Sequence, residues 1–263
     1  MKGENNVKLF CVSDIHGFYD ELREALDTAG FDQENETHLL IVCGDTTDRG
    51  PQPSEVISYL SQLMHKNKCI VIKGNHEQLM LECLERGYPC SHDYSNGTFD
   101  TICELGGAGA GRTFDECCII AEGRFKAFVN KMVNYFETKN YIFVHSFVPL
   151  KVLDDMPKYY TRGRVYEKME NWREAHYSDW EEARWGNPFQ LAKDGLLPDK
   201  CLVFGHWHTS WPRHHWAWSD EAEPEWGEGA DFSPYYGDGF IGIDACTGYS
   251  GKVNVLVLED ELI

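Results

Sequence analysis

The 263-residue sequence lacks three features that define common specialised classes of protein. No two cysteines are spaced as Cys-x-x-Cys, which excludes a zinc ribbon or a thioredoxin-type motif. No apolar run approaches the ~20 residues of a membrane span, so we expect no contact with a membrane. The glycine-rich stretch 106–111 lacks the Lys-Ser/Thr of a P-loop and the spacing of a dinucleotide-binding turn.

Basic residues are scarce as well. Only 24 Lys and Arg stand against 43 Asp and Glu, and the net charge is −19. Such a chain repels nucleic acid backbones, so we expect no nucleic-acid partner. A hydrophobic content of 42% excludes a disordered chain.

The N-terminal apolar run is too short for the core of a signal peptide, which makes cytoplasmic the expected location. Several of the ten cysteines lie inside apolar runs, where a thiol behaves as a small hydrophobe, so we expect them to be reduced.

The apolar pattern predicts an α/β fold. Short apolar runs suited to buried strands alternate with segments of helical periodicity, which indicates a parallel sheet. The expected strands are 7–13, 39–43, 69–73, 141–144 and 201–204, and the expected helices are 20–29, 51–64, 77–84 and 125–136. A closing hairpin is expected from 240–245 and 252–258. We expect a single domain over 1–263, with insertions at about 86–135 and 150–198.

Five polar clusters each follow one of the strand-like runs. Open α/β sheets place their ligand sites at the carboxyl ends of strands, so these clusters are expected to meet. They supply oxygen and nitrogen donors suited to two hard or borderline metal ions, and such sites usually perform phosphoester chemistry. The clusters are Asp14-Ile-His16-Gly17, Gly44-Asp45-Thr-Thr-Asp48-Arg49-Gly50, Gly74-Asn75-His76-Glu77, Val144-His145 and Gly205-His206-Trp-His208.

Each of these residues has a simpler explanation when it is taken alone. A single histidine at a strand end is more often structural than a ligand, Asp45 and Asp48 are common turn residues, and Arg49 could form a surface ion pair. The occurrence of all the clusters in one order favours the metal site. Asp45 follows a glycine that allows close backbone approach, and its carboxylate is the natural bridge between two ions.

These motifs resemble those of the calcineurin-like metallophosphoesterase superfamily, and the Asp48-Arg49-Gly50-Pro51 and Asn75-His76-Glu77 forms are similar to its serine/threonine protein phosphatase branch. That branch includes bacterial and phage phosphatases and diadenosine tetraphosphate hydrolases. The motifs span residues 14–208. The resemblance implies a four-layer α/β/β/α sandwich and hydrolysis of phosphomonoesters by direct attack of a metal-bridging hydroxide, without a phosphoenzyme.

The resemblance also implies a role for each motif residue. His76, oriented by Asp48, would protonate the leaving oxygen, and Arg49 would hold phosphate oxygens. Two metal ions are implied, Mn²⁺ in the first place in vitro, with Fe or Zn²⁺ as alternatives. The first ion would be bound by Asp14, His16 and Asp45, with His208 completing its ligands, and the second by Asp45, Asn75, His145 and His206.

The substrate class is less constrained than the reaction. A phosphorylated protein or peptide is the first expectation, a dinucleoside polyphosphate such as diadenosine tetraphosphate is the alternative, and a catalytically silent metal-binding scaffold is a remote third. A second phosphate-binding arginine is expected from Arg162, Arg164 or Arg184. The tryptophans Trp207, Trp211, Trp216 and Trp218 could stack on a base, although packing in the core is the favoured interpretation.

Overall fold

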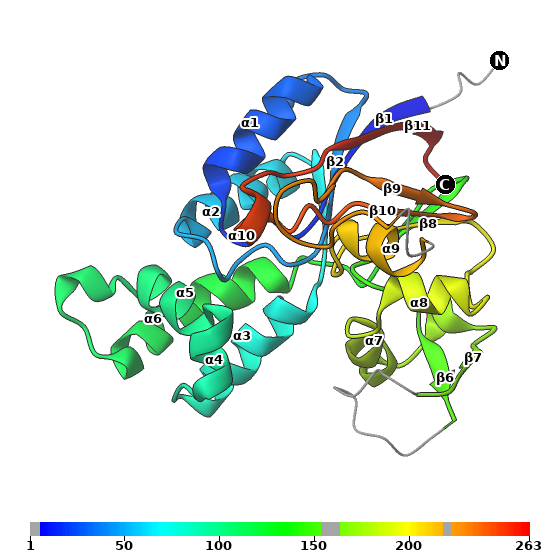
Figure 1. Ribbon diagram of the computed structural model, residues 1–263. Helices are drawn as coiled ribbons and strands as arrows, with labels where there is room; N and C mark the ends of the chain where they lie inside the picture. The colour runs from blue at the N-terminus through cyan, green and yellow to red at the C-terminus, as the bar shows by residue number, and fades with distance from the viewer. Residues whose placement is uncertain (1–5, 154–163, 218–221) are drawn as a thin grey trace.

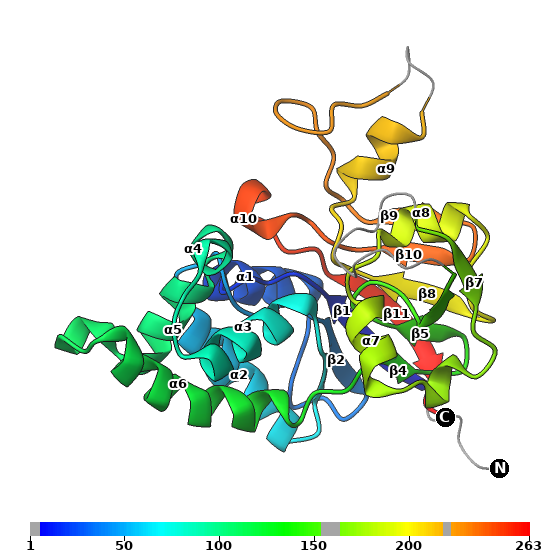
Figure 2. The same cartoon turned by 90° about the horizontal axis from the view of Figure 1, so that it is seen from below.

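The computed structural model describes residues 6–153, 164–217 and 222–263. Two sheets pack face to face, and helices cover the outer face of each sheet (Figure 1). Figure 2 shows the same arrangement from below, with α1 to α6 on one side of the strands and α8 toward the other.

The first sheet contains the expected parallel strands. Its order is β11-β1-β2-β3, in which β1, β2 and β3 are parallel and β11 is antiparallel to β1. The strands are β1 (Asn6–Val12), β2 (His38–Cys43), β3 (Cys69–Ile72) and β11 (Leu256–Glu261). The helices α1 (Tyr19–Ala29) and α2 (Pro53–His65) connect the parallel strands, and α3 (Asn75–Arg86) follows β3.

The second sheet has the order β4-β5-β8-β10-β9. Its strands are β4 (Phe136–Glu137), β5 (Tyr141–Phe143), β8 (Cys201–Phe204), β9 (Tyr235–Gly237) and β10 (Phe240–Gly242). A separate two-stranded ribbon is formed by β6 (Leu150–Val152) and β7 (Tyr166–Lys168).

The remaining helices lie in or near the two expected insertions. The first insertion holds α4 (Ser91–Asn96), α5 (Thr98–Gly106), the 3-10 turn η1 (Ala108–Ala110) and α6 (Phe114–Val129). The second holds the ribbon, the 3-10 turn η2 (Trp172–Glu174), α7 (Tyr177–Ala183) and α8 (Pro188–Lys193). The short helices α9 (Ser210–His215) and α10 (Thr247–Ser250) follow β8 and β10.

Three buried apolar clusters separate four layers. Alternate residues of a strand point to opposite faces, so Phe10 and Val12 pack against the helices of the first sheet, whereas Leu9 and Cys11 pack between the sheets. The third cluster joins the second sheet to η2, α7 and α8 through residues such as Phe189. The expected α/β/β/α sandwich is thereby confirmed.

Two local expectations were wrong. The helix expected at 125–136 is α6, which begins at Phe114 because Thr113 and Glu116 form a capping box there, and which ends at Val129. The expected closing hairpin is absent from the described strands. β10 joins the second sheet and β11 joins the first, with α10 between them.

All ten cysteines lie in the described ranges, and all are free thiols, as expected. Within the same ranges, no helix combines the length and the apolar character needed to cross a bilayer.

Candidate metal centre

The five polar clusters meet at one edge of the two sheets. They follow the carboxyl ends of β1, β2, β3, β5 and β8, so both sheets contribute. The donors are almost completely buried; Asp14, His16, Asp45, Asn75 and His145 each expose less than 5% of their surface. The structure therefore brings together residues that lie up to 192 positions apart in the chain, as in the bond from the His206 amide to Asp14.

Asp45 lies at the centre of the cluster. Its Oδ2 is 3.7 Å from His16 Nε2, and its Oδ1 is 3.4 Å from His145 Nε2. Its Oδ1 also accepts a hydrogen bond of 3.0 Å from the backbone amide of His76. The two carboxylate oxygens thus face different histidines, which is the arrangement expected of a ligand shared by two ions.

Hydrogen bonds to carbonyl groups orient two of the histidines. His16 Nδ1 donates to the carbonyl oxygen of Thr47 at 3.0 Å, and His145 Nδ1 donates to that of Cys43 at 2.8 Å. A carbonyl oxygen can only accept, so Nδ1 carries the proton in both rings and Nε2 carries the lone pair. Both Nε2 atoms lie within 4 Å of Asp45 and are unprotonated, as metal-ligating imidazoles require.

Asn75 and His206 complete one side of the cluster. The Nε2 of His145 lies 2.8 Å from Asn75 Oδ1 and 3.2 Å from His206 Nδ1. Asp14 lies on the other side, with one oxygen 3.9 Å from His16 Nε2 and the other accepting from the His206 amide at 2.9 Å.

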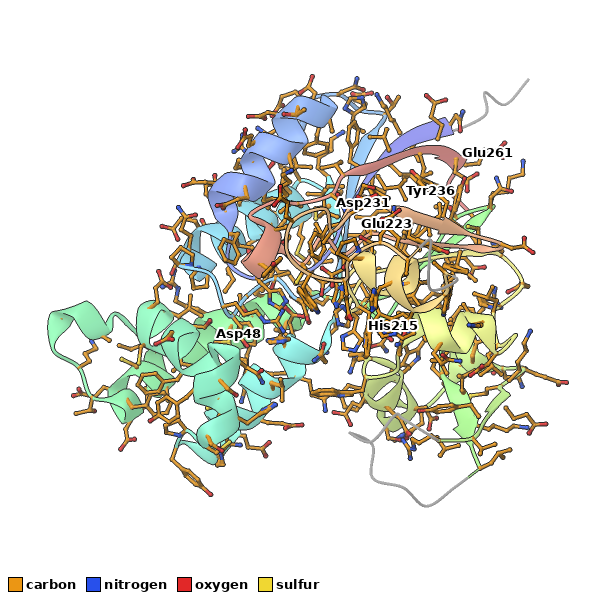
Figure 3. All side chains as sticks on the ribbon, viewed as in Figure 1. Asp48, His215, Glu223, Asp231, Tyr236 and Glu261 are labelled. Carbon is orange, nitrogen blue, oxygen red and sulfur yellow. The ribbon has the colours of Figure 1, made fainter. Side chains whose placement is uncertain are left out.

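His76, Asp48 and Arg49 form a second layer of contacts. His76 Nδ1 bonds Asp48 Oδ2 at 2.8 Å, and the hydroxyl of Thr98 donates to the same oxygen at 2.7 Å. The Arg49 guanidinium reaches across the cluster, with nitrogens 2.8 Å from His16 Nε2 and 3.2 Å from His76 Nε2. Figure 3 shows Asp48 beside α4 and α5, so the first insertion supports this side of the site.

Buried charge distinguishes the two carboxylates at the centre. Burial and the neighbouring Asp244 and Asp45 raise the pKa of Asp14 well above its ordinary range. Burial also acts to raise the pKa of Asp45, but His145, His76 and His16 outweigh it and leave a net pKa well below the usual value. Such crowding of buried carboxylates costs free energy that a bound cation would relieve.

The surroundings shift the pKa values of two histidines, His206 and His76, in opposite directions. Burial and the adjacent His145 lower the pKa of His206 to about 3, which keeps its ring neutral and able to bind a metal. Burial would also lower the pKa of His76, but the carboxylates of Asp45 and Asp48 raise it above its ordinary value. His76 is thus the ring in this group that its surroundings favour as a proton carrier.

Left-handed backbone gathers at this site. A positive φ is uncommon outside glycine and costs free energy that the surrounding structure must offset. In the described chain it occurs at six of the residues singled out above, namely Asp14, His16, Asp45, Asp48, Arg49 and His206.

Two glycines and Glu77 allow the clustered loops to approach closely. A Cβ at Gly44 would lie 2.5 Å from His145 Nδ1, and one at Gly74 would collide with Asp45 Oδ1. The buried carboxylate of Glu77 accepts hydrogen bonds from the amides of Gly74, Asp45 and Thr46 and from the Thr46 hydroxyl, at 2.7–3.1 Å. Sequence reasoning did not assign Glu77 to the site, although its place three residues after the cap of α3 was a signal.

Asp244 and Thr98 were missed as well. Asp244 is buried beside the cluster; burial raises its pKa to about 6, and its Oδ1 accepts from the Cys246 amide. The partner of Thr98 lies 50 residues away, so no signal local to Thr98 would have identified it.

His208 is the predicted ligand that the structure does not bring to this cluster. Its Nδ1 lies 2.8 Å from Ser210 Oγ, and its Nε2 lies 3.5 Å from a carboxylate oxygen of Glu225. These contacts turn the ring away from Asp14 and His16, so its predicted place among the ligands of the first ion gains no support.

The candidates for a second phosphate-binding arginine differ in their surroundings. Arg184 is buried and donates to the Lys73 carbonyl and to Asn134, which makes it a link between α7 and the strand before Gly74. Arg164 pairs with Glu182 and lines a cavity. Arg162 lies outside the described residues, as does Trp218.

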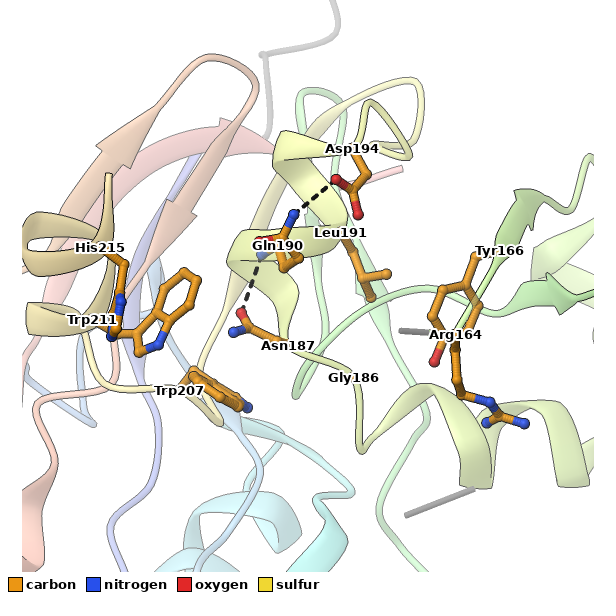
Figure 4. A pocket seen from close by; sticks show the side chains of 10 residues that line it. All are labelled: Arg164, Tyr166, Gly186, Asn187, Gln190, Leu191, Asp194, Trp207, Trp211 and His215. Atoms are coloured by element: carbon orange, nitrogen blue, oxygen red, sulfur yellow. Dashed lines mark hydrogen bonds between the residues drawn. The ribbon is translucent and has the colours of Figure 1, made fainter. Parts of the chain in front are cut away.

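A cavity of about 590 Å³ adjoins the metal centre (Figure 4). Trp207 lies at its base, with Trp211 and His215 on one side, and Leu191, Tyr166 and Arg164 on the other. Trp207 follows His206 directly, and Gly186 on the lining accepts a bond from Ser146, the neighbour of His145. Trp207, Trp211 and Trp216 all pack against the apolar cluster of the second sheet, and Trp207 and Trp211 also line this cavity.

Sequence comparisons place this geometry among known proteins. Residues 7–230 match the family described as calcineurin-like phosphoesterase. The asymmetrical bis(5'-nucleosyl)-tetraphosphatase PrpE of Halalkalibacterium halodurans is 38% identical over 71 residues, which are 25% of this chain and 29% of that protein. Serine/threonine-protein phosphatase 2 of Escherichia coli is 38% identical over 79 residues, 30% of this chain and 34% of that protein. The matches thus span about a third or less of these relatives.

A solved structure agrees on the fold. The cold-active protein-tyrosine phosphatase of a psychrophilic Shewanella species superposes with a TM-score of 0.53 at 14% identity, over 98% of this chain and 80% of that one. At that level of identity the likeness concerns the fold alone.

Proposed function

This chain belongs to the calcineurin-like phosphoesterase family and is a metal-dependent hydrolase, and from this premise we propose that its clustered donors bind two metal ions and that it hydrolyses phosphoesters beside them. The observation that carries the proposal is the convergence of donors from five strand ends on Asp45. Oxygen and imidazole donors without thiolate suit Mn²⁺, Fe and Zn²⁺.

The donors fit such ions on the evidence of their hydrogen bonds. Carbonyl partners leave the Nε2 atoms of His16 and His145 unprotonated beside Asp45, and burial and the neighbouring carboxylates raise the pKa of Asp14, which a bound cation would lower. Asp14, His16 and Asp45 would hold one ion, and Asp45, Asn75, His145 and His206 the other. Bound ions would supply Lewis acidity toward water and phosphate and neutralise charge in the transition state.

The side chains of the second layer would handle the proton and the phosphate. His76 would donate its proton to the leaving oxygen, since Asp48 fixes its Nδ1 and the surrounding carboxylates favour its protonated form. The Arg49 guanidinium, which already lies across the cluster, would hold two phosphate oxygens at once.

Among substrates, the cavity favours a nucleotide. Its volume of about 590 Å³ lies in the ordinary range for small-molecule sites, and its walls combine two indole rings with the amides of Asn187 and Gln190. Aromatic rings stack on bases, and amides bond base edges. A dinucleoside polyphosphate would place one base against Trp207 and its phosphate chain toward His206.

A phosphorylated protein is the second candidate. The stretch shared with serine/threonine-protein phosphatase 2 of Escherichia coli supports it, as does the sequence pattern around Asp48 and Asn75.

Parallel assays on diadenosine tetraphosphate and on a phosphoserine peptide, with Mn²⁺ and with a chelator, test the reaction and the substrate together. The chelator is expected to abolish turnover, and continued hydrolysis would contradict the metal-dependent mechanism. Trp207→Ala is expected to raise KM for the dinucleotide about tenfold while leaving the peptide unaffected, because base stacking contributes about 1–3 kcal/mol. Tyr236→Ala, on an exposed part of β9, is the matched control.

Faster cleavage of the peptide, with the same dinucleotide KM in Trp207→Ala as in the wild type, would reject the nucleotide and select the phosphoprotein.

A further inference from the structure

A second group of metal-type donors lies outside the centre described above. His215, on α9, has its Nε2 3.2 Å from Glu225 Oε2, and His208 has its Nε2 3.5 Å from Glu225 Oε1. A ring nitrogen of His214 lies within 4.8 Å of the donor atoms of His215 and Glu225. Figure 3 shows His215 by α9, well apart from Asp48, and Figure 2 shows α9 and the chain after it standing away from the sheets.

Hydrogen bonds determine which nitrogen of His208 is available. The Ser210 hydroxyl donates its single proton to the carbonyl oxygen of Glu225 at 2.8 Å. It must therefore accept from His208 Nδ1, at 2.8 Å, and His208 Nε2 is left to face the Glu225 carboxylate. The contact therefore requires a positive charge between the ring and the carboxylate, which either a proton on Nε2 or a bound metal ion supplies.

The two oxygens of one carboxylate each face a histidine nitrogen in this way. His208 and Glu225 are partly buried, with side chains 14% and 22% exposed, and His215 is exposed at 43%. The ring of His208 packs against Trp226, and that of His215 packs against Trp211, at centroid distances of 4.4 and 4.7 Å.

We propose that His214, His215 and Glu225 bind one divalent transition-metal ion of the Zn²⁺ class, with His208 facing the other oxygen of the Glu225 carboxylate. Imidazole nitrogen and carboxylate oxygen are the common non-thiolate ligands of zinc. Ligand bonds of about 2.0–2.1 Å in a tetrahedron separate the donor atoms by roughly 3.4 Å. The separation of 3.2 Å between His215 Nε2 and Glu225 Oε2 is close to that spacing, and the donor atoms of His214, His215 and Glu225 all lie within 4.8 Å of one another.

The ion would join two segments that meet at the edge of the cavity. His208 and His215 lie at the start and the end of the α9 region, and Glu225 lies in the chain that returns toward β9. His215 and its neighbour Trp211 both line the cavity. Metal binding would therefore hold this wall in place, outside the catalytic donor cluster and independently of whether that cluster is filled.

Zinc content per chain tests the site. Chelator-treated wild type, Glu225→Gln and His215→Ala are incubated with Zn²⁺ alone, desalted and analysed for metal by mass spectrometry, and their folding is compared by circular dichroism. Each variant is expected to hold one zinc ion fewer per chain than the wild type. This difference does not depend on how many ions the Asp45 cluster retains, so a failure of the proposed function would leave it unchanged.

A matched control uses His176, an exposed histidine that caps the N-terminus of α7 and bonds Ser178. His176→Ala is expected to retain the full zinc content. Equal content in the wild type, Glu225→Gln and His215→Ala would overturn the site, and an equal loss in His176→Ala would reduce it to nonspecific binding by surface imidazoles. Co²⁺ gives a second readout: a d–d absorption band present in the wild type and diminished in Glu225→Gln supports the site, and identical spectra contradict it.

Discussion

His76 is the residue of this cluster in which three properties occur together. It is buried, its Nδ1 bonds Asp48, and the adjacent carboxylates raise its pKa. No direct contact between its side chain and a proposed metal-ligand carboxylate is shorter than the 3.9 Å to Asp45 in the described structure. A donor atom of its ring also lies within 4.8 Å of donor atoms of His16 and Asp45, so a test of its proposed task must measure metal content beside turnover.

Replacement of His76 by Asn is expected to lower kcat by about 10²–10⁴-fold, the usual contribution of a positioned general acid. The amide keeps similar volume but carries no transferable proton, so the metal content per chain is expected to stay at the wild-type value. Steady-state kinetics and metal analysis measure the two quantities. His92→Asn, at an exposed position in α4, is the control, and unchanged turnover in His76→Asn would remove this ring from the mechanism.

At this scale the sequence predicted the donors better than their supports. Asp14, Asp45 and His145 belong to short motifs at strand ends, and topology alone brings strand ends together. Glu77 and Asp244 were not assigned to the site, because most of their hydrogen-bond donors are backbone amides, whose positions depend on how the loops fold. The metal-binding and catalytic roles assigned to the motif residues remain predictions.

At the scale of elements, the loops after β2 and β3 depend on one carboxylate. Glu77 accepts four hydrogen bonds that join the two loops, and it is fully buried. A buried donor that loses its acceptor costs about 1–3 kcal/mol.

Glu77→Gln is accordingly expected to lower the free energy of unfolding by about 1–3 kcal/mol, because its amide group turns N–H donors toward backbone donors. For a chain of this size that corresponds to a fall in Tm of roughly 2–10 °C. Calorimetry measures the shift, and Glu85→Gln, exposed on the same helix, should show none. A variant as stable as the wild type would show that the two loops hold together without this carboxylate.

Glu137 on β4 forms ion pairs with Arg173 of η2 and with Lys200. Hydrogen bonds from Arg173, together with Lys200, outweigh burial and lower its pKa to about 2. The folded state thus favours the ionised form. Its stabilising contribution is complete above the ordinary value of 4.5 and disappears as the pH falls toward about 2.

Glu137→Gln removes that charge and should therefore lower the free energy of unfolding by about 2–3 kcal/mol at neutral pH. The loss should become progressively smaller below pH ~4.5. Urea unfolding at several pH values measures the difference between wild type and variant. Glu167→Gln, whose side chain is well exposed beside Lys151, serves as the comparison. A difference that is constant with pH would contradict the linkage.

The elements that sequence reasoning misplaced depend on contacts distant in the chain. Residues 240–258 alternate like a hairpin, but Cys246 adopts a left-handed φ and residues 247–250 form α10, which sends β10 and β11 to different sheets. Periodicity reports which residues are buried and cannot report which strand they meet.

At the scale of the whole molecule, the excess of acidic residues repels the anionic substrates proposed above. A net charge of −19 repels phosphate compounds over a distance of about one Debye length, ~10 Å at 0.1 M salt.

We therefore expect kcat/KM for an anionic phosphate ester to rise about two- to tenfold between roughly 20 and 150 mM NaCl, since added salt screens this repulsion. Initial rates at low substrate concentration measure it, with choline chloride as a control for specific effects of sodium. A decrease with salt would instead mean that the local field of Arg49 and the bound ions governs encounter.

The layered architecture was the most predictable property of the whole chain. Alternation of apolar runs with amphipathic segments requires helices outside a buried sheet, and the family resemblance supplied the second sheet and its covering. The arrangement inside the insertions was not predictable, because α4, α5 and α6 are held by contacts with one another and with α2 and α3. That all 263 residues form one domain stays a prediction.

The pairing of β11 with β1 has a consequence for synthesis. Residues 6–11 register against 256–261, so the edge of the first sheet is covered by a strand that the ribosome releases long after β1. A nascent chain that has emerged only through β10 presents β1 as an open edge, with unpaired amides and carbonyls able to recruit other chains. During translation this edge, more than any surface of the finished protein, is where a chaperone would be needed.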